Sequence, residues 1–344
     1  MNKELKGKLL TGLIWTSGGQ FLTVFLNLGI NIILARFLSP EEFGVMGIVI
    51  FFILIGSVLS KGGLSGALIR MKEVTKVDYS TVFVFNMIVS LTLYLIIILS
   101  SGIIADFYDR PILKNLLIIG CLTFIIDAFQ LINITNLIRK LKFKERFIYQ
   151  FSATLISGII AFIMAYKGSG VWALIVLPLG TSLFLSIILF MKEGFHGGLK
   201  FSKESFRKTY AFGVNTSLAA LLETAFENIY SLLLGHYFSL TQVGYYYQAQ
   251  KLQKIPNNVL NAFSQRVLFP VLSKKQDDIG EFNNIYQRVM SLFTVLVGLS
   301  GLLIFLYAEP LIKISLGDKW IASIFYLKLL VVASFFYMQE QFNR

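Results

Sequence analysis

Apolar stretches long enough to cross a lipid bilayer follow one another through most of this 344-residue chain. A membrane-spanning helix needs about 20 consecutive, mostly apolar residues. Stretches of about this length lie at residues 11–35, 43–60, 81–105, 112–138, 148–167, 170–191, 209–238, 285–308 and 322–338. A tenth stretch, 243–272, is equally long but more polar. This pattern predicts an all-α, polytopic membrane protein with about ten spans.

The composition excludes an ordinary soluble domain. Only 15% of the residues are charged, 56% are hydrophobic, and the mean hydropathy is +0.71. Soluble domains carry about 25% charged residues, so this chain could not cover a water-exposed surface. We therefore expect membrane lipids to surround it.

The net charge of +12 raises nucleic acid as a partner, but the placement of the charge argues against that reading. Basic clusters occur at alternate connections between spans, while the connections between them are short and nearly neutral. Cytoplasmic loops keep Lys and Arg, so the alternation predicts a cytoplasmic N-terminus. The clusters are Lys3, Lys6 and Lys8; Arg70, Lys72 and Lys76; Arg139, Lys140, Lys142, Lys144 and Arg146; Lys192, Lys200, Lys203, Arg207 and Lys208; Arg266, Lys274, Lys275 and Arg288.

One helix–turn–helix junction is written twice in the chain. Residues 34–45 read LARFLSPEEFGV and residues 234–245 read LGHYFSLTQVGY, so that a Leu, a Ser and a Gly recur in register. The spans before the two junctions also share a polar stripe. On the first span it consists of Thr16, Gln20, Thr23, Asn27 and Asn31, and on the second of Thr216, Glu223, Glu227 and Ser231.

A polar stripe on one helical face predicts a span that faces a protein interior or a water-filled cavity, because lipid favours an apolar face. The repeat begins again after six spans, so both copies enter the membrane in the same direction. We therefore predict two parallel repeats around a central cavity. The first lobe is residues 1–200, with six helices, and the second is residues 201–344, with about four spans. Chance similarity between two apolar helices is the alternative.

The polar stretch 243–272 is ambiguous on hydropathy alone, and an amphipathic helix on the cytoplasmic surface would fit it. The connection before the span 209–238 is basic, and so is the connection after this polar stretch. Both connections should therefore be cytoplasmic. The span 209–238 leaves the cytoplasm, so the polar stretch must cross the membrane back to it. We therefore predict that this stretch is a span that lines the cavity and is kinked at Pro256.

Four segments in this order resemble bacterial polysaccharide flippases of the multidrug/oligosaccharidyl-lipid/polysaccharide exporter superfamily. They are ILARFLSPEEFGVMGIV, GGLSGALIR, LIRKLKFKERF and YYYQAQKLQKIPNNVLNAFSQRVLFPVLSK. The resemblance implies two lobes around a cavity in the bacterial inner membrane. It implies a lipid-linked oligosaccharide, carried on undecaprenyl pyrophosphate, as the substrate for O-antigen, capsule or exopolysaccharide assembly. A polysaccharide polymerase and a chain-length regulator are the implied partners. Such proteins usually have 12 or 14 spans, so ten spans predict an incomplete second bundle.

Intramembrane charges are the candidate site residues, because each is costly without a partner. Lys251, Lys254 and Lys61 could bind the pyrophosphate, and Gln20, Asn27 and Asn31 could line the substrate path. Glu223 and Glu227, one helical turn apart, could couple transport to a proton or cation, with Asp127 a weaker candidate. In the alternative reading the carboxylates are structural and the lysines pair with them or reach toward lipid headgroups.

Two other functions remain open. A cation-coupled multidrug exporter of the same superfamily would explain the carboxylates but gives the cavity lysines no role. A membrane glycan polymerase would need a large polar loop with catalytic residues, and the sequence has none. No catalytic constellation, metal-ligand cluster or cofactor motif stands out, so we expect a transporter rather than an enzyme, without a metal or cofactor.

Overall fold

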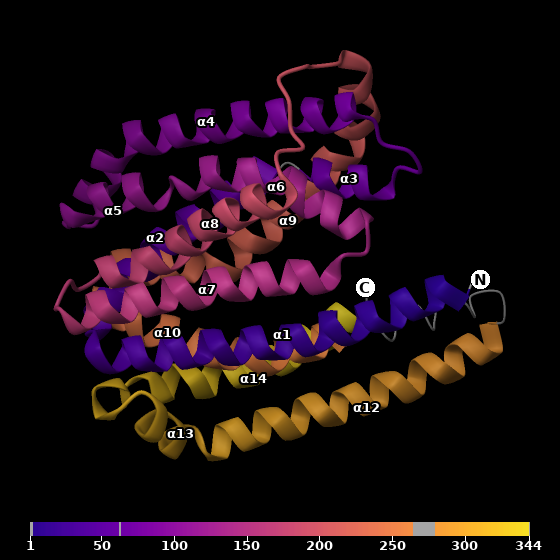
Figure 1. The fold of residues 1–344 in the computed structure, drawn as a ribbon. Helices are drawn as coiled ribbons and strands as arrows, with labels where there is room; N and C mark the ends of the chain where they lie inside the picture. The colour runs from indigo at the N-terminus through magenta and orange to yellow at the C-terminus, as the bar shows by residue number, and fades with distance from the viewer. Residues whose placement is uncertain (1–2, 62, 264–278, 344) are drawn as a thin grey trace. The chain divides into compact units, whose positions relative to one another are not determined.

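The computed structural model describes residues 3–61, 63–263 and 279–343, and these residues form helices joined by short connections, with no strand among them (Figure 1). The all-α prediction is confirmed. The chain forms two compact units, Met1–Val243 and Gly244–Arg344.

The long helices of the first unit run between two opposite ends (Figure 1). One end carries the turns α1–α2, α4–α5 and α7–α8, and is called the turn end here; the other carries the short helix α3 and is called the α3 end (Figure 1). The helices are α1 (Lys3–Phe37), α2 (Pro40–Lys61), α3 (Leu64–Arg70), α4 (Lys76–Phe107), α5 (Ile112–Gly120), α6 (Thr123–Arg139), α7 (Phe143–Tyr166), α8 (Trp172–Glu193) and α9 (Lys203–Tyr237).

The second unit is built around Trp320, whose side chain is fully buried. Tyr245 on α10 meets the Trp320 ring edge-on at 6.1 Å between ring centroids, and Tyr246 meets Tyr326 at the same distance. Its elements are α10 (Leu240–Phe263), whose first turn precedes the unit, α12 (Ile279–Leu306), α13 (Ala308–Ser315), a 3-10 turn (Asp318–Trp320) and α14 (Ser323–Asn343).

Among the described residues, eight helical segments are long and apolar enough to span a membrane. They match eight of the predicted stretches, and the stretch 322–338 corresponds to a shorter apolar segment, Ser323–Tyr337. The polar stretch forms α10, a helix of 24 residues that continues through Pro256. Its crossing of the membrane stays a prediction. Residues 264–272, with Arg266, and the basic residues Lys274 and Lys275 lie outside the described part.

The repeated junction predicted from the sequence is confirmed in its local structure. The helices before it, α1 and α9, have 35 residues each and end at Phe37 and Tyr237. In both junctions a serine hydroxyl caps the following helix: Ser39 Oγ accepts from the Glu42 N–H at 3.3 Å, and Ser239 Oγ from the Gln242 N–H at 3.4 Å. The same residue types therefore end one helix and start the next at both places.

The compact units do not divide at the repeat boundary. The lobes predicted from the sequence meet at residue 200, whereas the units meet at Val243. The difference lies in α9, which packs against α2, α3 and α4. Its contacts place it in the first unit, while its sequence register places it at the start of the second repeat.

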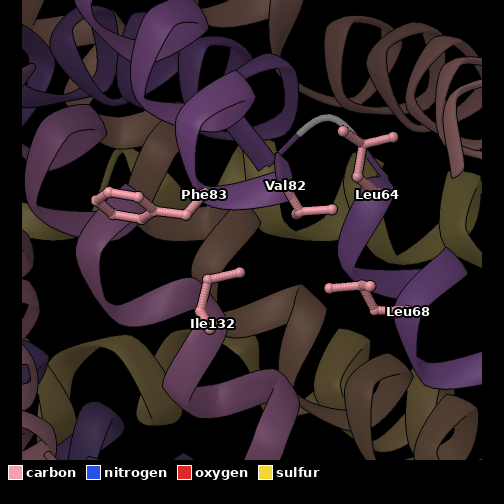
Figure 2. Close-up of a cluster of buried hydrophobic side chains, with 5 residues drawn as sticks. All are labelled: Leu64, Leu68, Val82, Phe83 and Ile132. Atoms are coloured by element: carbon pink, nitrogen blue, oxygen red, sulfur yellow. The ribbon is translucent and has the colours of Figure 1, made fainter. Parts of the chain in front are cut away.

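A cluster of buried apolar side chains fastens α3 to the first unit. Figure 2 shows its members: Leu64 and Leu68 of α3, Val82 and Phe83 of α4, and Ile132 of α6. Arg139, at the end of α6, ties the same region through its guanidinium, which donates to the carbonyls of Leu68, Ile69, Met71 and Lys72. The carbonyls of Leu68 and Ile69 belong to the last turn of α3, which has no helical partners for them, and those of Met71 and Lys72 follow the helix, so one side chain ties the end of α3 to α6.

Small residues let the long helices approach closely. A Cβ on Gly56 of α2 would overlap the Phe124 ring of α6, and one on Gly158 of α7 would overlap Ile30 of α1. In membrane proteins such contacts matter because van der Waals packing, and not exclusion from water, drives helix association.

Candidate functional site

Asp127 lies at the centre of a polar cluster among otherwise apolar helices. Ser182 Oγ of α8 and Gln130 Nε2 of α6 donate to Asp127 Oδ1, and Ser57 Oγ of α2 donates to Oδ2 at 3.5 Å. Gln130 Nε2 also donates to Ser182 Oγ at 3.1 Å. Three helices therefore supply hydrogen bonds to one carboxylate, which offsets the loss of water around its charge.

Lys61 completes this cluster from the last turn of α2. Its Nζ lies 3.6 Å from Asp127 Oδ2. The Lys61 side chain is 48% exposed, whereas that of Asp127 is 15% exposed. The anion is thus enclosed by protein while the cation stays open on one side. We call Ser57, Lys61, Asp127, Gln130 and Ser182 the Asp127 cluster.

The close contact of α2 with α6 positions the cluster. Gly56 leaves room for the Phe124 ring, and this contact lies one residue before Ser57 and three residues before Asp127. Ser57 and Lys61 are then one turn apart on α2, as Asp127 and Gln130 are on α6. Residues at these spacings share a helix face, so both faces meet at the carboxylate.

The structure brings Lys61 and Asp127 together, although the sequence analysis predicted separate roles for them, in substrate binding and in ion coupling. Ser57, Gln130 and Ser182 were missed by sequence reasoning. The pairs Ser57–Lys61 and Asp127–Gln130 carried a detectable signal, because each puts two polar residues on one face of an apolar span. Ser182 carried none, since a lone serine in a span commonly bonds its own backbone.

The predicted residues on α1 do not share one environment. Gln20 and Asn27 are exposed, and Asn27 Nδ2 donates to the Thr23 carbonyl at 2.9 Å. Asn31 is buried, with 7% of its surface exposed. Their role along a substrate path stays a prediction.

The two carboxylates on α9 differ in exposure. Glu223 is exposed and Glu227 is half-buried, one turn further along. Glu223 makes no hydrogen bond or ion pair with the described residues. The cation-coupling role of this pair also stays a prediction.

On α10, the Lys251 ammonium lies 4.7 Å from the centre of the Tyr247 ring, in the position of a cation–π contact. Lys251 and Lys254 are both half-buried. The aromatic face gives Lys251 one partner that is not a carboxylate.

The described residues contain no group of three His, Cys, Asp or Glu side chains that could hold a metal ion. Cys121 is buried with a free thiol in the break between α5 and α6.

The family profile that matches this chain and the relatives that are similar to it all carry names from polysaccharide biosynthesis. The profile of a family described as "Polysaccharide biosynthesis protein" matches residues 33–325. The lipopolysaccharide biosynthesis protein WzxC of Escherichia coli (strain K12) is 23% identical over 337 residues, which are 96% of this chain and 67% of the relative. The succinoglycan biosynthesis transport protein ExoT of Rhizobium meliloti (strain 1021) is 24% identical over 307 residues, 89% of this chain and 60% of the relative. This chain thus spans about two thirds or less of the length of these relatives.

Two solved structures share the fold. The lipid II flippase MurJ, in an inward closed conformation, matches with a TM-score of 0.71 at 17% identity, over 95% of this chain and 76% of its own. An inward-facing multidrug resistance transporter of the MATE family, in the MOP superfamily, matches with a TM-score of 0.64 at 16% identity, over 92% and 81%. At these identities the likeness establishes the fold, a multi-pass helical membrane protein. Since the family profile covers most of its length, the chain belongs to the polysaccharide biosynthesis protein family.

Proposed function

We propose that the protein containing this chain moves an undecaprenyl-pyrophosphate-linked oligosaccharide to the outer leaflet of the bacterial inner membrane by alternating access. The names of WzxC, ExoT and the lipid II flippase support this substrate class. They favour it over drug export and over polymerisation. The N-terminus would face the cytoplasm, in keeping with the basic loops, and a polymerase and a chain-length regulator would act on the product.

The Asp127 cluster carries the mechanism. A pyrophosphate group needs a cation that it can reach, and Lys61 presents a half-exposed ammonium beside a buried carboxylate. The Lys61 ammonium would leave Asp127 and bind the pyrophosphate instead. The carboxylate would keep its hydrogen bonds from Ser57, Gln130 and Ser182 and would not be left as a bare buried charge. When the substrate leaves, Lys61 returns to Asp127.

The same cluster offers a route to ion coupling. The Gln130 Oε1 atom is buried and accepts no hydrogen bond within the described part of the chain. Once Lys61 turns to the substrate, a proton or a small cation could take its place beside Asp127 Oδ2, and Gln130 Oε1, on the amide that bonds Asp127 Oδ1, would be a spare acceptor in the cluster. Substrate and coupling ion would then favour each other's binding by the same factor, since linkage is reciprocal. Glu223 and Glu227 on α9 are further coupling candidates, and Lys251, Lys254, Gln20, Asn27 and Asn31 are further substrate contacts in this proposal.

Binding of a short undecaprenyl-pyrophosphate glycan to the purified full-length protein in nanodiscs tests the proposal. Lys61→Gln should weaken binding about tenfold or more, the value of one charge-assisted contact, while Lys61→Arg should retain it. Asp127→Asn should bind more tightly, because Lys61 loses its competing partner, but should transport poorly. Lys114→Gln, an exposed lysine at the turn end, makes the same charge change away from the cluster and is the matched control. Equal affinity in wild type and Lys61→Gln would overturn the role of the cluster.

A further inference from the structure

We infer that the first unit has a second binding site, for a hydroxyl-rich sugar unit, at the end opposite Lys61. The site is a pocket of about 400 Å³ between the α1–α2, α4–α5 and α7–α8 turns, and we call it the turn pocket. The inference rests on the proposed function for the source of its ligand, the exported glycan. The polar side chains and the tryptophan that line it are Ser39, Glu41, Glu42, Arg110, Ser169 and Trp172.

The wall of the pocket formed by α2 is held in place by a capping box. Glu42 Oε2 accepts from the Ser39 N–H at 2.6 Å and from Ser39 Oγ at 3.0 Å, and the Glu42 N–H donates back to Ser39 Oγ. The reciprocal bonds fix both side chains and the start of the helix. This wall therefore needs little ordering when a ligand binds.

The opposite wall, the α7–α8 turn, is shaped to meet Glu42. Gly170 has a φ of 60°, and a Cβ at this position would lie 2.6 Å from Glu42 Oε1. A side chain would be strained by the backbone and would collide with the carboxylate, so only glycine fits both constraints. The turn can thus close against α2 and leave the pocket beside it.

The charges of the pocket are already largely matched. Glu41 Oε1 lies 2.7 Å from an Arg110 Nη atom, and Glu42 faces the N-terminus of α2, where the helix dipole favours an anion. A pyrophosphate would meet two carboxylates, and a free cation would meet Arg110. The arrangement therefore favours a neutral ligand, in contrast with the open cation at Lys61.

The hydrogen-bonding atoms of the turn pocket that its internal ion pair and capping box do not use suit sugar hydroxyls. Each hydroxyl both donates and accepts, and the pocket offers a guanidinium donor, a carboxylate acceptor and the Ser169 hydroxyl. Glu41 and Arg110 stay about half-exposed, at 46% and 48%, so their unused atoms remain accessible. Trp172 contributes a large apolar side chain with a single polar handle. A volume at the lower end of the range for small-molecule sites fits one or two sugar rings.

The position of the pocket gives it a use in transport. α2 runs from the pocket to Lys61, and its 22 residues span about 33 Å. The pyrophosphate end of the substrate would thus bind at Lys61 and the glycan end in the turn pocket, at opposite ends of α2. A sugar held at the turn end would oppose return of the glycan after crossing.

Saturation-transfer NMR on the full-length protein in nanodiscs tests the inference without the lipid-linked substrate. The probes are free glucose, galactose, mannose and N-acetylglucosamine and their disaccharides, with inorganic pyrophosphate as the charged competitor. We expect saturable transfer from at least one sugar and no competition by pyrophosphate. Trp172→Ala should weaken the signal about fivefold, while Trp172→Phe should largely retain it through its aromatic ring.

The double variant Glu41→Gln with Arg110→Gln keeps the net charge but breaks the ion pair, and it should also lose binding. Trp15→Ala, on α1 outside the pocket, is the matched control, and Lys61→Gln should bind the sugars as wild type does. Absence of saturable transfer, equal transfer in Trp172→Ala, or displacement by pyrophosphate would overturn the inference. Sugar binding that persists while Lys61→Gln has normal affinity for the lipid-linked glycan would instead remove the Asp127 cluster from the proposed function.

Discussion

His196, in the connection between α8 and α9, is held by a single asparagine of α6. Its backbone N–H and its Nδ1 lie 3.4 and 3.1 Å from Asn133 Oδ1, and Asn133 Nδ2 donates to the Gly194 carbonyl at 2.7 Å. The Asn133 oxygen can only accept, so Nδ1 carries the proton of the neutral ring. Burial lowers the pKa of His196 below its ordinary value of 6.5, and the nearby Lys140 acts in the same direction.

This lowered pKa predicts a loss of stability on acidification. Above about pH 6.5 the ring is neutral in both the folded and the unfolded protein, and its contribution is complete. As the pH falls below that value, the unfolded chain takes up a proton first, and stability declines until the folded protein is protonated too. From about pH 8 to about pH 5, wild type should therefore lose more thermal stability than His196→Gln. Thermal melts in detergent measure this, and parallel pH profiles would contradict it.

At the scale of helices, the contact of α2 with α6 connects packing to function. The Phe124 ring packs against the Gly56 backbone, and the residues that follow on each helix supply every member of the Asp127 cluster except Ser182 of α8. The helices could not approach as closely with any side chain at position 56. The geometry of the site thus depends on a residue that makes no polar contact with it.

Gly56→Ala should destabilise the protein by about 1–3 kcal/mol, as overpacking of a core does, and should separate Lys61 from Asp127. Binding of the lipid-linked glycan should then change together with the melting temperature. Gly102→Ala on α4 is the control, because a Cβ there meets no atom within 4 Å. Phe124→Leu in the Gly56→Ala background should restore part of the stability by returning volume to the contact. A melting temperature equal to wild type in Gly56→Ala would show that the contact does not position α6.

At the scale of the whole molecule, the alternation of basic and near-neutral connections makes a definite topology prediction. In a Cys121→Ala background, single cysteines at Lys167 and Tyr237 should react with an impermeant maleimide in intact cells. Cysteines at Lys72, Lys140 and Lys200 should react only after the membrane is opened. All five positions are exposed, so reactivity reports their side of the membrane. Labelling at Lys72 in intact cells would contradict a cytoplasmic N-terminus.

The sequence by itself determined the apolar spans and their order, but not the short helices α3 and α13 or the break between α5 and α6. The length of an apolar stretch and the spacing of polar residues along it are local properties, so they predicted the spans and the polar stripe. They also predicted the repeated junction at Ser39 and Ser239 from residues that recur in register, and the structure adds a capping bond there between residues only three positions apart. The family followed from the same local segments.

Only the tertiary structure decided which helix faces meet. Lys61 and Asp127 lie on different spans, and nothing near either residue in the chain marks the other as its partner. Their pairing follows from side-chain volume, above all from the space at Gly56 for Phe124. The turn pocket likewise joins three turns that are distant in the chain. Such contacts depend on close packing between helices, which a pattern of apolar and polar residues does not specify.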